Sequence, residues 1–78
     1  MRVQVRYFAR LREIKARATE EVEVDAATSV EALYGKLFPP GPGGVLPVMY
    51  AVNQAYVDPA QVLSEGDEVA FIPPLGGG

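Results

Sequence analysis

A single helix signal stands between segments whose side chains alternate between apolar and polar, and this pattern strongly limits the possible folds. Within residues 28–38 the apolar residues recur at helical spacing, at Val30, Leu33 and Leu37. Thr28 and, three residues later, Glu31 predict a capping box, in which the two side chains would satisfy free N–H groups at the helix start. Pro39 disfavours helical geometry at the residue before it and ends the element. We expect a helix of about ten residues here.

The other regular segments are strands. Period-2 alternation, typical of half-buried strands, predicts strands at residues 1–8, 20–24, 48–52 and 68–72, with a short returning strand at 56–57. Residues 9–14 form a short helical turn, and the proline- and glycine-rich stretch 39–47 is a loop within one domain. Pro73 and Pro74 stop the last strand, because neither has an N–H for the ladder.

The order of elements predicts the architecture. One helix must cover the apolar face of one mixed sheet, and the first two strands are close enough to form an antiparallel hairpin. The simplest arrangement sets the first and last strands side by side in parallel. We therefore expect an α+β fold of the β-grasp, or ubiquitin-like, type. The 78 residues predict a single domain, 1–78, with a flexible C-terminal tail at 73–78.

The residue inventory excludes several functions. The chain has no cysteine or histidine, so it offers no thiolate nucleophile, no imidazole base and no usual zinc site. We expect no bound metal or cofactor. The net charge of −3 argues against nucleic acid as a partner. No apolar run is long enough to span a bilayer, and the N-terminus is typical of a strand rather than a signal peptide. We expect a soluble, cytoplasmic protein without a membrane partner.

The C-terminal end is the main functional candidate, and it reads Pro73-Pro74-Leu75-Gly76-Gly77-Gly78. A frayed, inert end is the ordinary interpretation of such a sequence. Against it, the tail leaves a strand expected in mid-sheet, the prolines restrict its direction, and three residues without Cβ suit a narrow channel. Residues 75–78 reach roughly 13 Å when extended, enough to place a carboxylate inside another protein. Joining that carboxylate to AMP would make it a good electrophile, with the machinery supplied by the partner.

Four stretches occur here in the combination found in one family: YFARLRE at 7–13, TSVEAL at 28–33, AVNQ at 51–54, and LSEGDEVAFIPP at 63–74 before the glycines. Through them the chain resembles the small subunit of molybdopterin synthase, the MoaD-type sulfur carriers, over essentially its whole length. Gly76 departs from the family, which more often has Ala, Ser or Thr there.

The resemblance implies a chemical cycle. A ubiquitin-activating-like adenylyltransferase, consuming ATP, adenylates Gly78, and a sulfur donor converts the acyl-adenylate to a thiocarboxylate. Gly76 and Gly77 thread the tail into the large catalytic subunit of molybdopterin synthase. There the sulfur passes to cyclic pyranopterin monophosphate to build the dithiolene of molybdopterin. The small subunit donates sulfur without being catalytic, and we expect no activity from it alone.

Residues beside the tail are candidates for partner binding. We expect such contacts from Leu75, Phe71, Pro73 and Pro74, although Phe71 is also a candidate for the core. Weaker candidates are Phe8 and Met49. The densest basic region consists of Arg2, Arg6, Arg10 and Arg12. It is either a solvated face or a means of steering toward an acidic partner.

Three other functions remain open. A carrier for thiamine or tRNA thiolation would use the same terminal chemistry with another acceptor. A ubiquitin-like protein modifier would form isopeptide bonds, for which only Lys15 and Lys36 could accept a second copy. A passive binding domain would tolerate the loss of Gly78.

Overall fold

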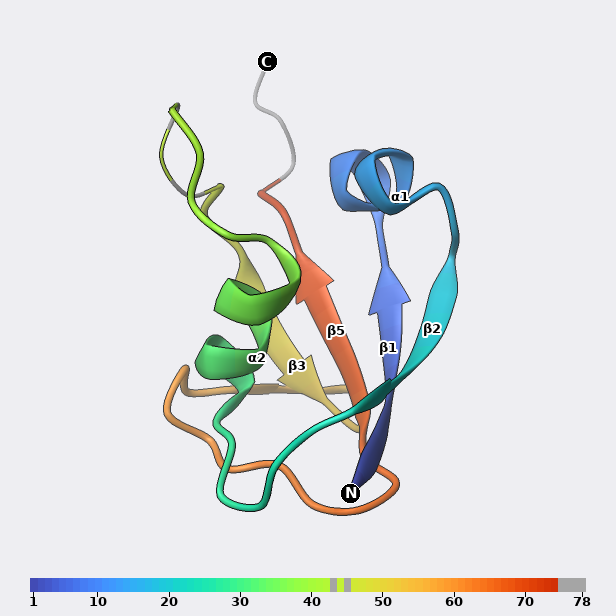
Figure 1. Cartoon of the computed structure of the whole chain (residues 1–78), viewed down its shortest axis with the longest axis vertical. Coiled ribbons are helices and arrows are strands. Elements are labelled where there is room, and N and C mark those ends of the chain that lie inside the picture. The colour runs from blue at the N-terminus through green and yellow to red at the C-terminus, as the bar shows by residue number, and fades with distance from the viewer. Residues whose placement is uncertain (43, 45, 75–78) are drawn as a thin grey trace.

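The computed structural model describes residues 1–42, 44 and 46–74. Along the chain it contains β1 (Arg2–Tyr7), α1 (Ala9–Lys15), β2 (Thr19–Glu23), α2 (Val30–Leu37), β3 (Met49–Val52), β4 (Ala55–Val57) and β5 (Glu68–Ile72). Figure 1 shows these elements in sequence colours. The expected order is confirmed, with shifts of one or two residues at most boundaries. Neither of the two described helices is long and apolar enough to cross a membrane.

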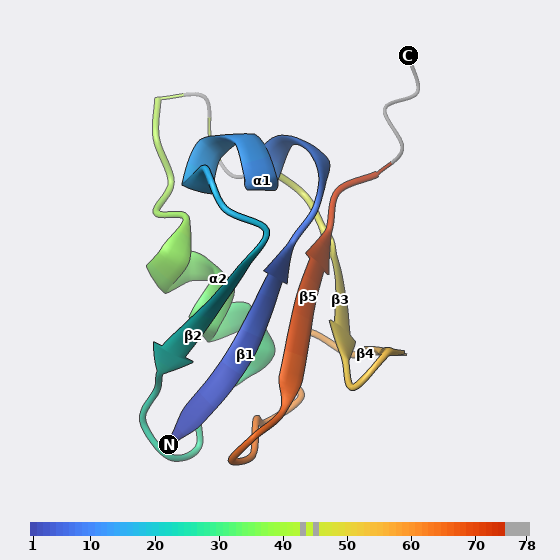
Figure 2. The same ribbon diagram turned by 90° about the vertical axis from the view of Figure 1, so that its right-hand side faces the viewer.

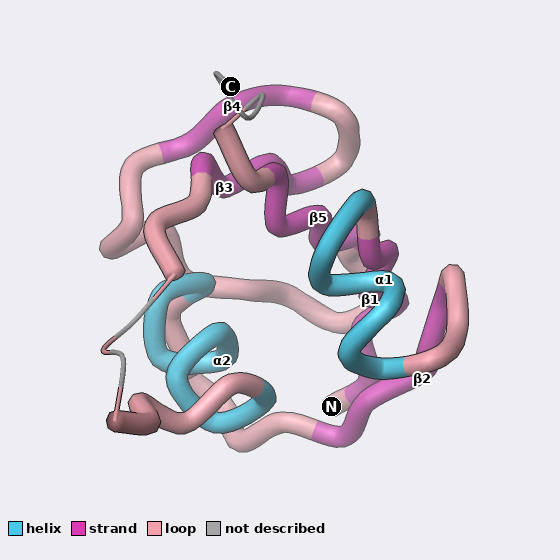
Figure 3. Tube along the Cα trace, turned by 90° about the horizontal axis from the view of Figure 1, so that it is seen from above, coloured by secondary structure: helices cyan, strands magenta, loops and turns pink. Residues whose placement is uncertain are grey.

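The strands of the described residues form one mixed sheet in the order β2-β1-β5-β3-β4. Strand β1 pairs in parallel with β5 and antiparallel with β2, and β3 is antiparallel to both β4 and β5. The expected pairing of the first and last long strands is therefore confirmed, and β5 lies in the middle of the sheet. Helix α2 covers one face, whereas α1 lies at the end toward which β1 and β5 run (Figures 2 and 3). This is the β-grasp arrangement.

The core lies between α2 and the sheet. Its buried side chains come mainly from β1, β5 and α2, as Val3, Val5, Tyr7, Val69, Phe71, Val30, Leu33 and Tyr34. Because successive strand side chains point to opposite faces, the same strands turn Arg6, Glu68 and Ala70 to the other face. No helix of the described residues lies over that second face (Figure 2). We call it the open face.

The start of α2 differs from the capping box expected at Thr28. The N-cap is Ser29, whose Oγ accepts a hydrogen bond from the Ala32 N–H at 3.1 Å. A Thr28 cap would have accepted the Glu31 N–H, but that group donates to the Pro59 carbonyl at 3.1 Å. A loop distant in sequence thus satisfies the donor and moves the helix start by one residue. The helix has eight residues rather than about ten.

Candidate functional site

The end of β5 forms the root of the C-terminal tail. Its last ladder pairs join Phe71 to Tyr7 of β1 and Ile72 to Met49 of β3. Pro73, half-buried, and Pro74, exposed, follow directly. Since proline has no N–H, the ladder ends where these residues begin. The chain therefore leaves the sheet from a central strand held by a neighbour on each side.

Phe71 anchors this root from inside the protein. It is 0% exposed, and its ring centre lies 5.0 Å from that of Tyr34 and 6.0 Å from that of Tyr50. The structure assigns Phe71 to the core, the second interpretation that the sequence allowed, rather than to an exposed partner surface, because alternation along β5 turns its side chain toward α2. Its role is to pack the end of β5 against the helix.

The structure describes only some of the other tail candidates. Pro73 and Pro74 are placed, and both remain predicted partner contacts. Leu75, Gly76, Gly77 and Gly78 lie outside the described residues, so their predicted roles stay predictions.

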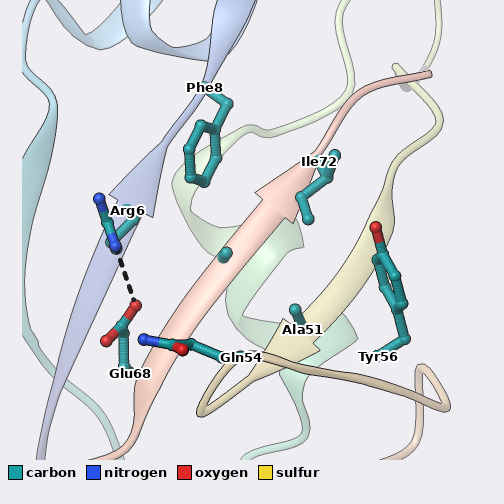
Figure 4. Close-up of a pocket in the computed structure, with 8 residues that line it drawn as sticks. Arg6, Phe8, Ala51, Gln54, Tyr56, Glu68 and Ile72 are labelled. Carbon is teal, nitrogen blue, oxygen red and sulfur yellow. Dashed lines mark hydrogen bonds and ion pairs between the residues drawn. The ribbon is translucent and has the colours of Figure 1, made fainter. Parts of the chain in front are cut away.

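The open face carries a groove close to the tail root, which we call the alanine groove. Its volume is about 230 Å³, and it is lined by Arg6, Phe8, Ala51, Gln54, Tyr56, Glu68, Ala70 and Ile72. Figure 4 shows these side chains along β5, with Ile72 and Phe8 near the end from which the tail leaves. Ala51 and Ala70 are cross-strand partners on β3 and β5. Because each contributes only a methyl group, the sheet surface is hollow between the larger side chains beside them.

One edge of the alanine groove is charged. Arg6 Nη1 lies 3.3 Å from Glu68 Oε2, and the Arg6 guanidinium lies 5.7 Å from the centre of the Phe8 ring (Figure 4). The two charged side chains are 47% and 31% exposed. A pair this exposed contributes about 0–1 kcal/mol to stability. Its more important effect is to place one cation and one anion at fixed positions beside an apolar hollow.

Large apolar side chains remain exposed around the same root. Phe8 is 39% exposed and Met49 51%, and Tyr56 beside them is 67% exposed. Phe8 and Met49 were the weaker candidates from the sequence, yet they are exposed on the surface, whereas Phe71 is not. Sequence reasoning missed the groove itself, because Ala51 and Ala70 become a feature only when the register places them opposite each other.

The described residues include no group of three or more potential metal ligands. Burial, followed by a hydrogen bond to Glu20, raises the pKa of Tyr7, and burial likewise raises the pKa values of Tyr34 and Tyr50. These phenols thus move away from neutrality and do not act as acids or bases near pH 7. The arrangement suits the presentation of a chain end and the binding of a partner.

Comparisons with known proteins cover the chain nearly end to end. The model of the ThiS family matches residues 5–78. The molybdopterin synthase sulfur carrier subunit of Chlamydomonas reinhardtii is 36% identical over 83 residues, with 100% of both chains covered. That of Mycobacterium tuberculosis is 40% identical over 82 residues, covering 100% of this chain and 99% of the relative.

Solved structures give the same picture of the fold. Small archaeal modifier protein 1 of Haloferax volcanii superposes with a TM-score of 0.73 and 25% identity, covering 95% of this chain and 98% of that one. A chain from the complex of subunits 1 and 2 of the molybdopterin-converting factor of Helicobacter pylori has a TM-score of 0.63 and 21% identity, with 100% of both covered. At that identity the second likeness concerns the fold alone.

Proposed function

This chain belongs to the ThiS family and is of the MoaD type, and from that premise we propose that it is the sulfur carrier subunit of a molybdopterin synthase. It would serve the synthesis of the molybdenum cofactor. The observation that carries the proposal is the length of the similarity: it runs from the first strand through residue 78, so it includes the terminal glycines. A relative that shared only the fold would not need to match that end.

The proposed chemistry occurs at Gly78. A carboxylate oxygen of Gly78 attacks the α-phosphate of ATP on an activating enzyme, which releases pyrophosphate and leaves an acyl-adenylate. Hydrosulfide supplied by a sulfur donor then attacks the acyl carbon; a C–S bond forms, the C–O bond to AMP breaks, and a thiocarboxylate, AMP and a proton result. This chain supplies no catalytic group for either step, in keeping with its lack of cysteine and histidine.

The proposed partner is the large catalytic subunit of the synthase. The relatives of 36% and 40% identity are named sulfur carrier subunits of molybdopterin synthase, which supports a partner subunit of this kind. We place its contacts on the alanine groove and on Pro73, Pro74 and Leu75. The groove has room for an apolar partner side chain, and burying one contributes about 1.5–3 kcal/mol to binding. Energy concentrated in a few anchors of this kind is typical of protein interfaces.

Intact-mass analysis of the protein from its native cell tests the carrier chemistry. We expect a fraction whose mass rise matches one oxygen replaced by sulfur, located at Gly78 by fragmentation. A chain that retains the free carboxylate when the activating enzyme, ATP and sulfur donor are all supplied would contradict the proposal.

A second candidate function is protein modification, favoured by the likeness to small archaeal modifier protein 1. It predicts isopeptide bonds between Gly78 and lysines of other proteins. Enrichment of the protein from cells, followed by peptide mapping for Gly78–lysine junctions, separates this function from sulfur transfer. A carrier for thiamine or tRNA thiolation would show the same thiocarboxylate and deliver it to a different acceptor.

A further inference from the structure

We propose that α1 and the turn after it form a docking surface for carboxylates of the large subunit, beside the point where the tail enters it. This surface, the basic cap, consists of Arg10, Arg12 and Arg17. The inference rests on the proposed function and adds to it the chemistry of the partner surface.

The basic cap lies at the root of the tail. In the parallel pairing of β1 and β5, Tyr7 stands beside Phe71. Helix α1 begins two residues after Tyr7, and Pro73 begins two residues after Phe71, so the two segments leave the same end of the sheet together. Figures 1 and 2 show α1 next to the end of β5 from two directions. A protein that receives the chain beyond Pro74 therefore approaches α1.

The charge of this end is opposite to that of the whole chain. Residues 8–18 contain four cations and one glutamate, a net charge of +3. The rest of the chain has the other three cations and nine carboxylates, a net charge of −6, which together give the overall −3. The loops at residues 24–29 and 58–67, both at the opposite end, carry only acidic charges (Figure 1). An acidic partner surface thus attracts the molecule most strongly when the end that carries the tail faces the partner.

Two arginines of the cap are available for a partner. Among the described residues, Arg10 and Arg12 have no carboxylate within 4.0 Å, whereas the Arg17 guanidinium lies 3.4 Å from Glu20. Arg12 and Arg17 line a shallow depression of about 530 Å³ together with Glu13 and three alanines, so its lining carries two cations against one carboxylate. The planar guanidinium groups match carboxylates in bidentate geometry. The depression therefore suits an aspartate or glutamate side chain of the partner.

The cap is also held firmly in place. Leu11 of α1 is 0% exposed in the core, and the Tyr7 N–H donates to the Ala18 carbonyl at 2.8 Å. The first contact holds α1 against the core, and the second holds the turn that carries Arg17 at Ala18. The positions of the cations are therefore set before a partner arrives, which lowers the entropic cost of binding.

The test measures association between this chain and the large subunit encoded in the same genome, by stopped flow over a range of ionic strength. Arg12→Glu is compared with Lys36→Glu, which changes the net charge equally but on α2. We expect Arg12→Glu to slow association about tenfold at low salt and to flatten its salt dependence. We expect Lys36→Glu to leave the rate within about twofold of the wild type, and both variants to keep the wild-type melting temperature.

Three outcomes would overturn the inference. Equal association rates for the wild type and Arg12→Glu would remove the cap from the interface while leaving the proposed function intact. Equal losses in both variants would show an effect of net charge alone. Failure of the wild type to bind the large subunit, together with absence of the thiocarboxylate in the mass assay, would overturn the proposed function as well.

Discussion

At the scale of single residues, the buried Phe71 should matter for stability, whereas the exposed Phe8 should matter for binding rather than for stability. Phe71 is 0% exposed among aromatic rings, so Phe71→Ala leaves a cavity between β5 and α2. We expect a loss of about 3–5 kcal/mol in the free energy of unfolding, measured by urea titration. The control is Phe8→Ala, 39% exposed, which should cost less than about 1 kcal/mol. A Phe71→Ala variant as stable as the wild type would show that the ring is not part of the core.

The alanine groove leads to a second residue-scale prediction. Ala70→Val fills the floor with a residue that strands favour, so stability should change by less than about 1 kcal/mol. Binding to the large subunit should weaken about tenfold, because the space for an apolar side chain is lost. Calorimetric titration measures the effect, with Gln4→Val on the open face as the matched control. Unchanged affinity for Ala70→Val would remove the groove from the interface.

Tyr7 predicts the behaviour of the fold in alkali. Burial, then the hydrogen bond to Glu20, raises the pKa of Tyr7 above its ordinary value near 10. Its contribution to stability is therefore complete below about pH 10 and is lost as the pH rises toward the folded-state pKa. We expect the free energy of unfolding to fall above about pH 10, and Tyr7→Phe to flatten that fall. The raised pKa values of Tyr34 and Tyr50 affect the wild type and Tyr7→Phe equally, so they do not account for a difference in slope between the two. Identical slopes for the two proteins would contradict the assignment to Tyr7.

At the scale of elements, the start of α2 depends on one side chain and one distant loop. Ser29→Ala removes the acceptor for the Ala32 N–H and should cost about 1 kcal/mol in thermal or urea unfolding. Ser29→Asp keeps an acceptor and places a negative charge at the positive end of the helix, so it should retain wild-type stability. The cap assignment fails if Ser29→Ala is no less stable than Ser29→Asp.

At the scale of the whole molecule, fold and function should separate at the chain end. Deleting Gly78 should leave the melting temperature unchanged, because the described core draws on no residue beyond Phe71. Gly77 would then provide an equivalent carboxylate, but withdrawn by roughly 3.3–3.6 Å. Since a misplacement of about 1 Å can cost on the order of a hundredfold in rate, adenylation should collapse.

The assay for this prediction is ATP–pyrophosphate exchange with the activating enzyme, followed by sulfur transfer to the pterin precursor. Appending one alanine after Gly78 is the companion variant, since it displaces the acyl group in the opposite direction. Normal rates with both variants would show that the position of the terminal glycine does not matter, and the central proposal would fall.

Much of this protein could be predicted from the sequence, because the signals are local. Alternation along residues 1–8 and 68–72 predicted β1 and β5, since side-chain direction in a strand depends only on position. Pro73 and Pro74 marked the end of β5 through a missing N–H, which no tertiary contact can supply. The order of these local elements also predicted the parallel pairing of β1 with β5.

Other features were decided only by contacts between residues far apart in the sequence. The Pro59 carbonyl accepts the Glu31 N–H and moves the cap from Thr28 to Ser29. The register of β3 against β5 sets Ala51 opposite Ala70 and creates the groove. A local pattern indicates which face of a strand is apolar. It does not indicate which strand pairs with that one, or which part of the sheet surface stays uncovered. Those choices follow from the packing of the whole chain around one core, so the tail was visible in the sequence while the surface around its root was not.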